Sequence, residues 1–320
     1  MGADMDWDEQ RLGRHLKLRE LSALSAVARC GSMGKAAVQL SVSQSAISKA
    51  IADMEYTLGV RLLDRSPQGV EPTIYGRALL DHGLAAFDEL RQAMKQIEYL
   101  ADPTAGELRI GATIVVATGF VTAVLDELTR RYPRIVFHVL AAEAGMSYRA
   151  LEERRVDLVV TNIFAPLAGE HMQAEVLYEE PQVVVVGAQN PWARRRKMKL
   201  ADLMDEPWTL PPPDTLFGSV VAEAFRASGL DIPRATVVTS NISVRNALLA
   251  TGRFLTMVQG SVLAFPTNNP ALKDLPIKLP PTTRRPVGLI TLKNRTLNPV
   301  AQLFIDSARE IAKPLAEHRT

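Results

Sequence analysis

The chain has 320 residues, of which 47% are hydrophobic and 22% are charged, and its formal net charge is +2. These values are typical of a globular protein of two or three domains, and so small a net charge says little about partners. The single cysteine, Cys30, excludes an internal disulfide framework. No apolar run has membrane-spanning length and no apolar signal core is present, so we expect a cytoplasmic protein.

The first predicted helix covers residues 18–28 and follows a mixed-charge tail at residues 1–14. Its apolar stripe consists of Leu18, Leu21, Leu24 and Ala28. This stripe can cover the back of the helices that follow. Cys30, near the end of this helix, is expected to be a small buried side chain, and a redox switch is the less favoured alternative.

Residues 31–59 predict two short helices joined by a tight turn. Ser32 is a suitable N-cap for the first helix, which ends near Leu40, and Ser43 is a suitable N-cap for the second. Ser41 and Val42 form the turn. The segment therefore has the form of a helix-turn-helix.

The second of these helices has an apolar face and a small polar face. The apolar stripe is Ile47, Ile51, Met54 and Leu58, and the opposite face carries Gln44, Ser45, Ser48, Lys49, Ala52 and Tyr56. A narrow face with amide, hydroxyl and basic groups suits the major groove of DNA. On periodicity alone, an ordinary helical hairpin with a polar outer face is an equal alternative.

The next segment favours the DNA-binding interpretation. Residues 60–73 predict a short strand pair around a turn at residues 66–69, with Arg61 and Arg65 on the strands and Thr73 at the end. Between residues 11 and 77 there are ten Lys and Arg against five Asp and Glu, a local charge of +5 that suits phosphate contacts. A helix-turn-helix followed by a basic hairpin is a winged arrangement.

From residue 32 to residue 76 the sequence resembles the N-terminal pattern of the LysR-type transcriptional regulators. The matching positions are Ser32, Ala36, Ala37, Leu40, Ser43, Gln44, Ser48, Ile51, Glu55, Leu58, Gly59, Leu62, Arg65, Thr73 and Gly76. The departures are Ser45, where the family often has Pro, Leu63, usually Phe, and Met33 with Gly34, usually an apolar or aromatic residue and Thr. The resemblance implies a winged helix-turn-helix domain over residues 1–73. The expected DNA contacts are Ser43, Gln44, Ser45, Ser48, Lys49, Arg65 and Thr73.

Residues 74–101 contain no proline and predict one long helix of about 40 Å. Its apolar residues recur at three- and four-residue steps and form a seam, which indicates pairing with a second subunit. A helix packed within its own chain is the alternative. In the resembled family this element, here residues 74–102, is the dimer-forming linker helix.

After the break at residues 102–106, strands alternate with helices, which predicts parallel α/β sheets. The pattern forms two units, and the resemblance extends over this half as an effector domain of periplasmic-binding-protein-like fold at residues 107–320. Lobe I is expected at about residues 107–165 and 272–320, and lobe II at about residues 166–271. The crossings between the lobes are expected near residues 164–169 and 265–275.

No catalytic residues, metal site or cofactor are expected in this half. The sequence lacks nucleotide-binding glycine motifs and a nucleophile elbow, and its histidines have no metal-ligand spacing. His138, in the middle of a predicted strand, is expected to be a core residue. The basic run at residues 194–199 is expected to be a solvated loop, and a second nucleic-acid patch is the alternative.

A binding cleft is expected instead at the carboxyl ends of the strands, where helix N-termini present free amides. The candidate residues are Thr113, Thr118, Thr161, Asn162, Phe217, Gly218, Ser240 and Asn241. Each of them could equally be a helix cap, and only their convergence favours a site. Their chemistry suits a carboxylate-like small molecule. No arginine is evident among the strand ends, so a highly charged effector is not expected.

We therefore expect a LysR-type regulator, not an enzyme, whose promoter binding is modulated by an effector in the interlobe cleft. The resemblance implies a homodimer through the linker helix and a homotetramer on double-stranded promoter DNA, with RNA polymerase as a possible further partner and no membrane association. The alternatives are a stand-alone small-molecule-binding protein and an enzyme with the same two-lobed fold.

Overall fold

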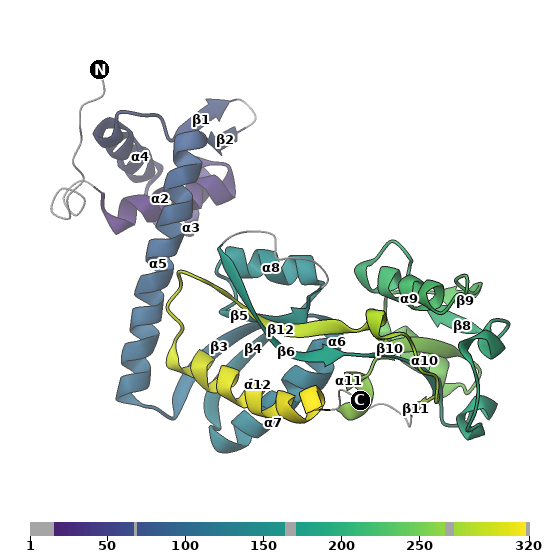
Figure 1. Ribbon diagram of the computed structural model, residues 1–320. Coiled ribbons are helices and arrows are strands. Elements are labelled where there is room, and N and C mark those ends of the chain that lie inside the picture. Colours follow the sequence, from purple (N-terminus) through teal and green to yellow (C-terminus); the bar gives the residue numbers. More distant parts are fainter. Residues whose placement is uncertain (1–15, 67–68, 164–170, 266–271, 318–320) are drawn as a thin grey trace. The chain divides into compact units, whose positions relative to one another are not determined.

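The structure is a computed structural model that describes residues 16–66, 69–163, 171–265 and 272–317 (Figure 1). The chain divides into two compact units, Met1–Arg91 and Gln92–Thr320. Helix α5 (Ile74–Ala101) is continuous across this division, with the bounds that the sequence predicts. The expected tail at residues 1–14 lies outside the described residues.

The first unit contains the three helices that the sequence predicts: α2 (Leu18–Cys30), α3 (Met33–Gln39) and α4 (Gln44–Leu58). Ser32 and Ser43 accept hydrogen bonds from the first turns of α3 and α4, so both predicted N-caps are confirmed. The helices enclose a core in which Leu24, Ile47 and Ile51 are almost completely buried. Cys30 is half-buried, and its Sγ donates to Gln39 Oε1 at 3.1 Å.

Two short antiparallel strands, β1 (Leu63–Ser66) and β2 (Gly69–Pro72), form the predicted wing. The wing is tied to α4 because Glu55 Oε1 accepts hydrogen bonds from the amides of Leu62 and Leu63, at 2.8 and 3.2 Å. A Cβ atom at Gly76 would meet the Leu62 carbonyl oxygen at 2.0 Å, so only glycine allows α5 to begin so close to the wing.

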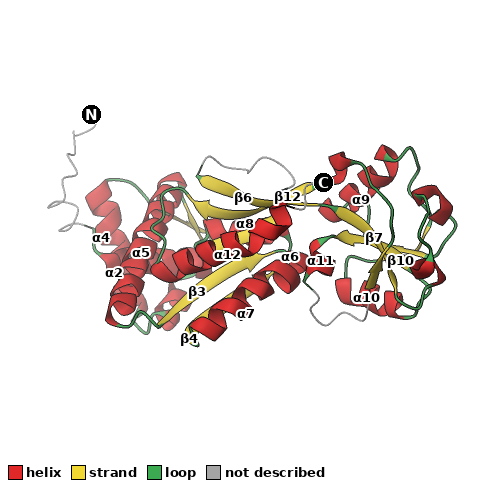
Figure 2. Ribbon diagram, turned by 60° about the horizontal axis from the view of Figure 1, so that its bottom comes forward, coloured by secondary structure: helices red, strands yellow, loops and turns green. Residues whose placement is uncertain are grey.

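In the second unit, the described part of lobe I has a five-stranded sheet in the order β4-β3-β5-β12-β6 (Figure 2). The strands are β3 (Ala105–Ala112), β4 (Arg134–Ala141), β5 (Leu158–Asn162), β6 (Met172–Glu180) and β12 (Arg285–Leu292). The first three are parallel, as predicted, whereas β12 is antiparallel to both β5 and β6. The sheet is therefore mixed.

Helices cover both faces of the lobe I sheet. They are α6 (Ile114–Val116), which continues through a π-helical turn, η1 (Ala117–Val121), into α7 (Thr122–Arg131), together with α8 (Ala144–Glu152) and α12 (Pro299–Glu317). The main core joins α7 and α12 to one face of the sheet, and a smaller cluster joins α8 to the other.

The described part of lobe II has a second five-stranded sheet, in the order β11-β7-β10-β8-β9. The strands are β7 (Gln182–Gly187), β8 (Trp208–Leu210), β9 (Ala235–Val238), β10 (Leu255–Gln259) and β11 (Leu272–Asp274). The helices are α9 (Leu216–Ala227), α10 (Ile242–Ala250) and α11 (Ser261–Ala264), with short 3₁₀ turns η2 (Pro191–Arg194), η3 (Leu200–Leu203) and η4 (Pro281–Thr283). Trp208 packs edge-on against Phe225 at the centre of this lobe.

The chain changes sheets at Pro181, between β6 and β7, and returns between β11 and β12. Both places lie later in the sequence than the expected crossings, of which residues 164–169 and most of 265–275 fall outside the described residues. The expectation followed turn-forming residues, which mark loops. It passed over β6, a strand with three glutamates among its apolar residues, which pairs with β12 in lobe I.

His138 is not a core residue, and that expectation was wrong. It lies on β4, an edge strand, where its side chain is 54% exposed and Nε2 is 3.6 Å from Glu107 Oε2. An edge strand leaves polar side chains in solvent, and the sequence pattern of β4 does not distinguish an edge from a central strand.

Candidate nucleic-acid interface and ligand cleft

The face of α4 that the sequence predicts to contact DNA is exposed to solvent. Gln44, Ser45 and Lys49 are exposed, Ser48 is half-buried, and Tyr56 is 91% exposed at the far end of the helix. The buried face carries the predicted apolar residues of the core. The structure therefore presents the polar residues of this helix together as one ridge.

Ser43 and Thr73 have structural roles in addition to any contact with DNA. The Ser43 hydroxyl accepts from the amide of Ala46 at 3.1 Å and lies 2.9 Å from Ser45 Oγ. The Thr73 hydroxyl donates to the carbonyl of Arg61 at 2.8 Å and accepts from the amide of Gly76 at 3.0 Å. Thr73 thus fixes the start of α5 against the wing, on which Arg65 is exposed.

The second unit contains a cleft of about 570 Å³ between its two lobes. The lining residues are Thr113, Ile114, Val115, Ala142, Glu143, Ala144, Asn162, Pro211, Asp214, Thr215, Leu216, Phe217, Ser240, Asn241, Arg245 and Gln259. They follow or end six strands, β3, β4 and β5 of lobe I and β8, β9 and β10 of lobe II. The carboxyl ends of these parallel strands meet at the cleft, as in other open α/β sheets.

Five of the eight residues that the sequence suggested for an effector site line this cleft: Thr113, Asn162, Phe217, Ser240 and Asn241. The other three do not line it. Thr118 lies one turn further along and donates to the carbonyls of Ile114 and Val115, and Thr161 is buried inside β5. Gly218 is buried in the first turn of α9, where an added Cβ would meet the Pro212 carbonyl oxygen at 1.9 Å. Its role is to let α9 begin close to that carbonyl.

The floor of the cleft is polar and joins the lobes. Gln259 Nε2, at the end of β10, donates to Asn162 Oδ1, at the end of β5, at 2.7 Å. Asn162 Nδ2, Gln259 Oε1 and Thr113 Oγ1 are buried without hydrogen-bond partners among the described residues. Buried polar atoms are normally paired with protein, water or ligand, so these atoms are available to a bound molecule.

Helix N-termini also face the cleft. Thr215 caps α9 by accepting from the amide of Gly218 at 3.0 Å, and Asn241 caps α10 by accepting from Ser243 and Val244 at 2.9 and 3.2 Å. The capping alternative is therefore correct for Asn241, which caps a helix and lines the cleft. The positive ends of both helix dipoles favour a negatively charged group there.

Arg245 is the functional candidate that the sequence reasoning missed. It lies on α10, lines the cleft and is only 3% exposed. The expectation concerned the residues at the strand ends, where no arginine is evident, whereas Arg245 lies inside α10. One helical turn separates Arg245 from the N-cap Asn241, and this spacing places both on one side of α10, a signal that the sequence does contain.

A second titratable group lies where the chain crosses between lobes. Glu180 ends β6, is fully buried and accepts a hydrogen bond from the amide of Ser261 at 2.7 Å. Burial raises the pKa of Glu180 to about 7, against the lowering effect of the hydrogen bond from the Ser261 amide. Burial next to Glu180 raises the pKa of Tyr178 as well. Since Ser261 follows β10 of lobe II, this contact links the two lobes next to the crossing at Pro181.

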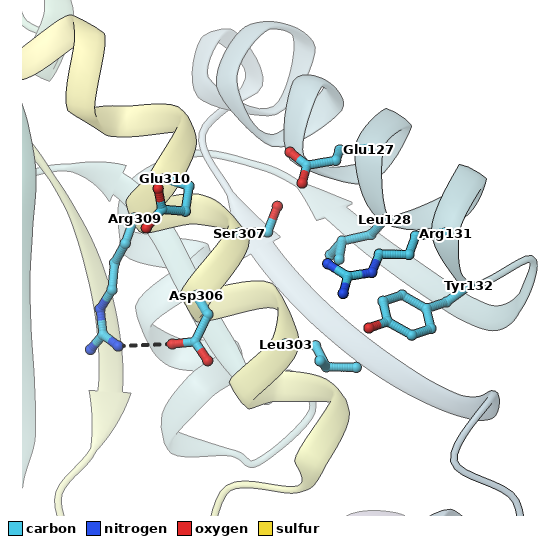
Figure 3. Close-up of a pocket in the computed structure, with 9 residues that line it drawn as sticks. All are labelled: Glu127, Leu128, Arg131, Tyr132, Leu303, Asp306, Ser307, Arg309 and Glu310. Atoms are coloured by element: carbon cyan, nitrogen blue, oxygen red, sulfur yellow. Dashed lines mark hydrogen bonds and ion pairs between the residues drawn. The ribbon is translucent and has the colours of Figure 1, made fainter.

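A further hollow, of about 400 Å³, lies between α7 and α12 (Figure 3). Neither of its arginines is a buried, unpaired charge. Arg309 pairs with Glu175 at 2.8 Å and with Asp306 at 3.0 Å, and Arg131 is exposed to solvent beside the Tyr132 ring. The hollow therefore lacks the unmatched buried charge that distinguishes the interlobe cleft.

Within the described ranges, no three His, Cys, Asp or Glu side chains gather closely enough to hold a metal ion. In the same part of the chain, every helix is too short or too polar to cross a membrane.

Comparison with known families gives two matches that together cover most of the chain. Residues 18–77 match the bacterial regulatory helix-turn-helix proteins of the lysR family, and residues 101–313 match the LysR substrate binding domain. The two matches lie on either side of residues 78–100, which form most of the long helix α5.

Individual relatives and solved structures agree with these matches. The HTH-type transcriptional regulator GbpR of Azospirillum brasilense is 26% identical over 301 residues, covering 93% of this chain and 87% of GbpR. Full-length OxyR from Pseudomonas aeruginosa has a similar fold, with a TM-score of 0.66, 20% identity and coverage of 96% and 99%. Full-length CbnR in complex with its target DNA has a TM-score of 0.54, 23% identity and coverage of 93% and 100%.

Proposed function

This chain belongs to the LysR family of bacterial transcriptional regulators, and we propose that it occupies its promoter as paired dimers whose DNA contacts change when a carboxylate-like effector binds in the interlobe cleft. Its relatives are regulators, so neither the enzyme nor the stand-alone binding protein is favoured. The observation that carries the proposal is the convergence of six strand ends on one cleft with unpaired buried polar atoms. The site of action is the cytoplasm, where the promoter is accessible.

The ridge on α4 reads the promoter. Gln44, Ser45 and Lys49 contact base edges or nearby phosphates, because amide, hydroxyl and ammonium groups match the major-groove donors and acceptors. Ser43 and Ser48 anchor phosphates, and Arg65 reaches from the wing to the backbone or minor groove. For Thr73 we propose a positioning role, since its hydroxyl is engaged at the start of α5.

Helix α5 forms the dimer. Its exposed apolar side chains include Leu90, Met94, Ile97 and Leu100, which are between 49% and 71% exposed. Leu90, Met94 and Ile97 follow one another at four- and three-residue steps, as in the seam of a coiled coil. Two dimers form the tetramer, which occupies an interrupted inverted repeat and can contact RNA polymerase.

The effector lies on the cleft floor and draws the lobes together. Thr113 and Asn162 contact it from lobe I, and Phe217, Ser240 and Asn241 contact it from lobe II. Thr118, Thr161 and Gly218 position these residues from adjacent turns and strands. Closure alters the spacing of the paired DNA-binding units, because a ligand that binds one lobe arrangement better shifts the population toward it.

A gel-shift titration against the DNA upstream of the protein's own gene, with and without a metabolite panel, tests this function. We expect specific binding that weakens steeply with salt, and a footprint whose length changes with one class of metabolite. Binding that ignores promoter sequence, or a footprint that no metabolite alters, contradicts the proposal.

Two variants test the DNA contacts. Gln44→Ala should alter sequence preference by about 1–3 kcal/mol, because it removes an amide that pairs with a base edge.

Arg65→Ala should weaken binding to all sequences and reduce the salt slope by about 1, because it removes one phosphate contact. Arg194→Ala is the control, since its exposed arginine lies on η2 of lobe II. An equal loss with Arg194→Ala would support the basic run as a second nucleic-acid patch.

A further inference from the structure

We propose that Arg245 is the anchor for one carboxylate group of the effector, and that the effector is a monocarboxylate with a compact apolar body. The inference rests on the proposed function, in which the cleft holds the effector. It names the residue that selects the ligand and states how many negative charges the ligand carries.

Among the residues that the structure describes, no carboxylate pairs with the buried guanidinium of Arg245. The residue is 3% exposed, and its Nε and Nη1 atoms have no hydrogen-bond partner within the described part of the chain. Its guanidinium lies over the ring of Phe217, whose centroid is 5.4 Å from Cζ. An aromatic face attracts a cation, but it does not satisfy the N–H donors.

Burial of a cation without a counter-charge is unfavourable, and the pKa of Arg245 reflects this cost. Removal from water lowers the pKa of Arg245 to about 10, with burial as the cause. Buried charges in proteins are normally paired, and removing one partner of a buried pair is strongly destabilising. A ligand carboxylate would provide the missing counter-charge and accept hydrogen bonds from the free nitrogens.

The surroundings of Arg245 favour an anion more than Arg245 would alone. It lies in the second turn of α10, whose N-terminus faces the cleft, and the N-termini of α8 and α9 contribute Ala144 and Leu216 to the lining. Three positive helix ends and one guanidinium therefore surround the same space. A cationic ligand would be repelled from this end of the cleft.

The remaining charges limit the ligand to one carboxylate. Arg245 is the one basic residue among the described residues that line the cleft, whereas Glu143 and Asp214 are acidic and exposed at its rim. A second carboxylate would find no second cation and would face these two acids, which is unfavourable.

The walls of the cleft favour an apolar body. Ile114, Val115, Leu216 and Phe217 contribute apolar surface from both lobes, and Ile114 and Leu216 are 44% and 54% exposed. Burying this surface against hydrocarbon gives favourable free energy in proportion to its area. The volume of about 570 Å³ lies within the range of sites for small molecules.

Thermal shift and calorimetry on the full-length chain test the proposal with a matched compound panel. The panel contains acetate, hexanoate, cyclohexanecarboxylate and benzoate, the amides hexanamide and benzamide, and the dicarboxylates succinate and phthalate. We expect stabilisation by the larger monocarboxylates and by neither the amides nor the dicarboxylates. In Arg245→Gln, the Kd of the best monocarboxylate should rise about tenfold or more, since a charge-assisted hydrogen bond is lost.

Arg253→Gln is the matched control, because Arg253 is an exposed lobe II arginine that also lies over a ring, that of Phe254. Its Kd for the same compound should equal that of the wild type. The proposal is overturned by amides that bind as well as carboxylates, by dicarboxylates that bind best, or by an Arg245→Gln chain with unchanged Kd. It is also overturned if no monocarboxylate binds the wild type.

These results are distinguishable from failure of the proposed function. If the inference alone is wrong, the wild-type footprint still responds to some metabolite of another class, and Arg245→Gln retains that response. If the proposed function is wrong, promoter binding by the wild type responds to no metabolite, whatever the thermal-shift panel gives.

Discussion

In the described part of the second unit, arginine is buried at two places, which differ in what surrounds the charge. In the Asp157 cluster, next to β5, Arg295 Nη2 lies 2.8 Å from Asp157 Oδ1 and Lys95 Nζ lies 3.3 Å from Oδ2. The amide of Arg109 also donates to Asp157, at 2.9 Å, and the Gln92 amide group donates at 3.4 Å. In the cleft, Arg245 is buried to a similar degree but has no such partner among the described residues.

The charges of the Asp157 cluster stabilise the fold, whereas the charge of Arg245 is available to a ligand. The Asp157 cluster joins the last turns of α5 to the strands of lobe I and satisfies its own donors and acceptors. Arg245 lies on α10 of lobe II and lines the cleft, where Asn162 at the end of β5 and Gln259 also keep atoms without a hydrogen-bond partner among the described residues. Stability experiments should therefore give opposite signs at the two places.

The largest effect is expected for Asp157→Asn. The substitution keeps the shape of the side chain but leaves Lys95 and Arg295 without their common counter-charge, so the free energy of unfolding should fall by about 3–5 kcal/mol. Urea unfolding of the full chain, followed by circular dichroism, measures the change.

The control for this prediction is Asp126→Asn. Asp126 pairs with Arg130 at 2.6 Å, but the two side chains are 59% and 77% exposed, so we expect a change of about 0–1 kcal/mol. Equal losses in the two variants would contradict a structural role for the buried cluster.

A smaller effect, with a pH signature, is expected for Glu180→Gln. Burial raises the folded-state pKa of Glu180 from 4.5 to about 7, so the proton on Glu180 stabilises the folded chain below pH 4.5. This contribution is lost as the pH rises through about 7. The variant, which cannot ionise, should therefore be more stable than the wild type at pH 8 by about 2–3 kcal/mol, with a smaller difference at pH 5.

Glu179→Gln, at the half-buried neighbouring position, is the control and should follow the wild-type pH dependence. Urea unfolding at the two pH values provides the comparison. A Glu180→Gln chain whose stability changes with pH in parallel with the wild type would place the titrating group elsewhere.

Most helices and strands could be predicted from the sequence, because capping residues and hydrophobic periodicity agree along most of the chain. The caps Ser32 and Ser43 and the bounds of α5 are confirmed. The sequence did not reveal β6, β8 and β11, because a short strand, or one with charged residues on an outer face, lacks a distinct period. The antiparallel pairing of β12 was also missed, since strand direction depends on contacts distant in sequence.

The position of the ligand cleft could be predicted from the sequence, whereas the charged groups buried in and near it could not. Strand ends placed Thr113, Asn162 and Asn241 at the cleft, because the carboxyl ends of parallel strands meet at one edge. The electrostatics were not predictable, because whether an arginine is buried and unpaired depends on what the rest of the fold packs around it. Arg245 and Glu180 are ordinary helix and strand residues in the sequence, and their burial is a property of the folded chain.

The smallest expected change in the free energy of unfolding is that of Arg245→Met, and its sign is opposite to that of Asp157→Asn. It is therefore the most direct test of the difference between the cleft and the Asp157 cluster. Arg245→Met replaces an unpaired buried cation with an apolar side chain of similar length beside Phe217, so the ligand-free chain should gain about 1–2 kcal/mol in free energy of unfolding. Arg253→Met, at an exposed position, should change stability by less than about 0.5 kcal/mol. If urea unfolding instead gave Arg245→Met a loss like that of Asp157→Asn, the guanidinium would be part of the protein's own framework. A gain means that the folded chain carries an unfavourable charge in the cleft, which is a property of a binding residue that a ligand completes.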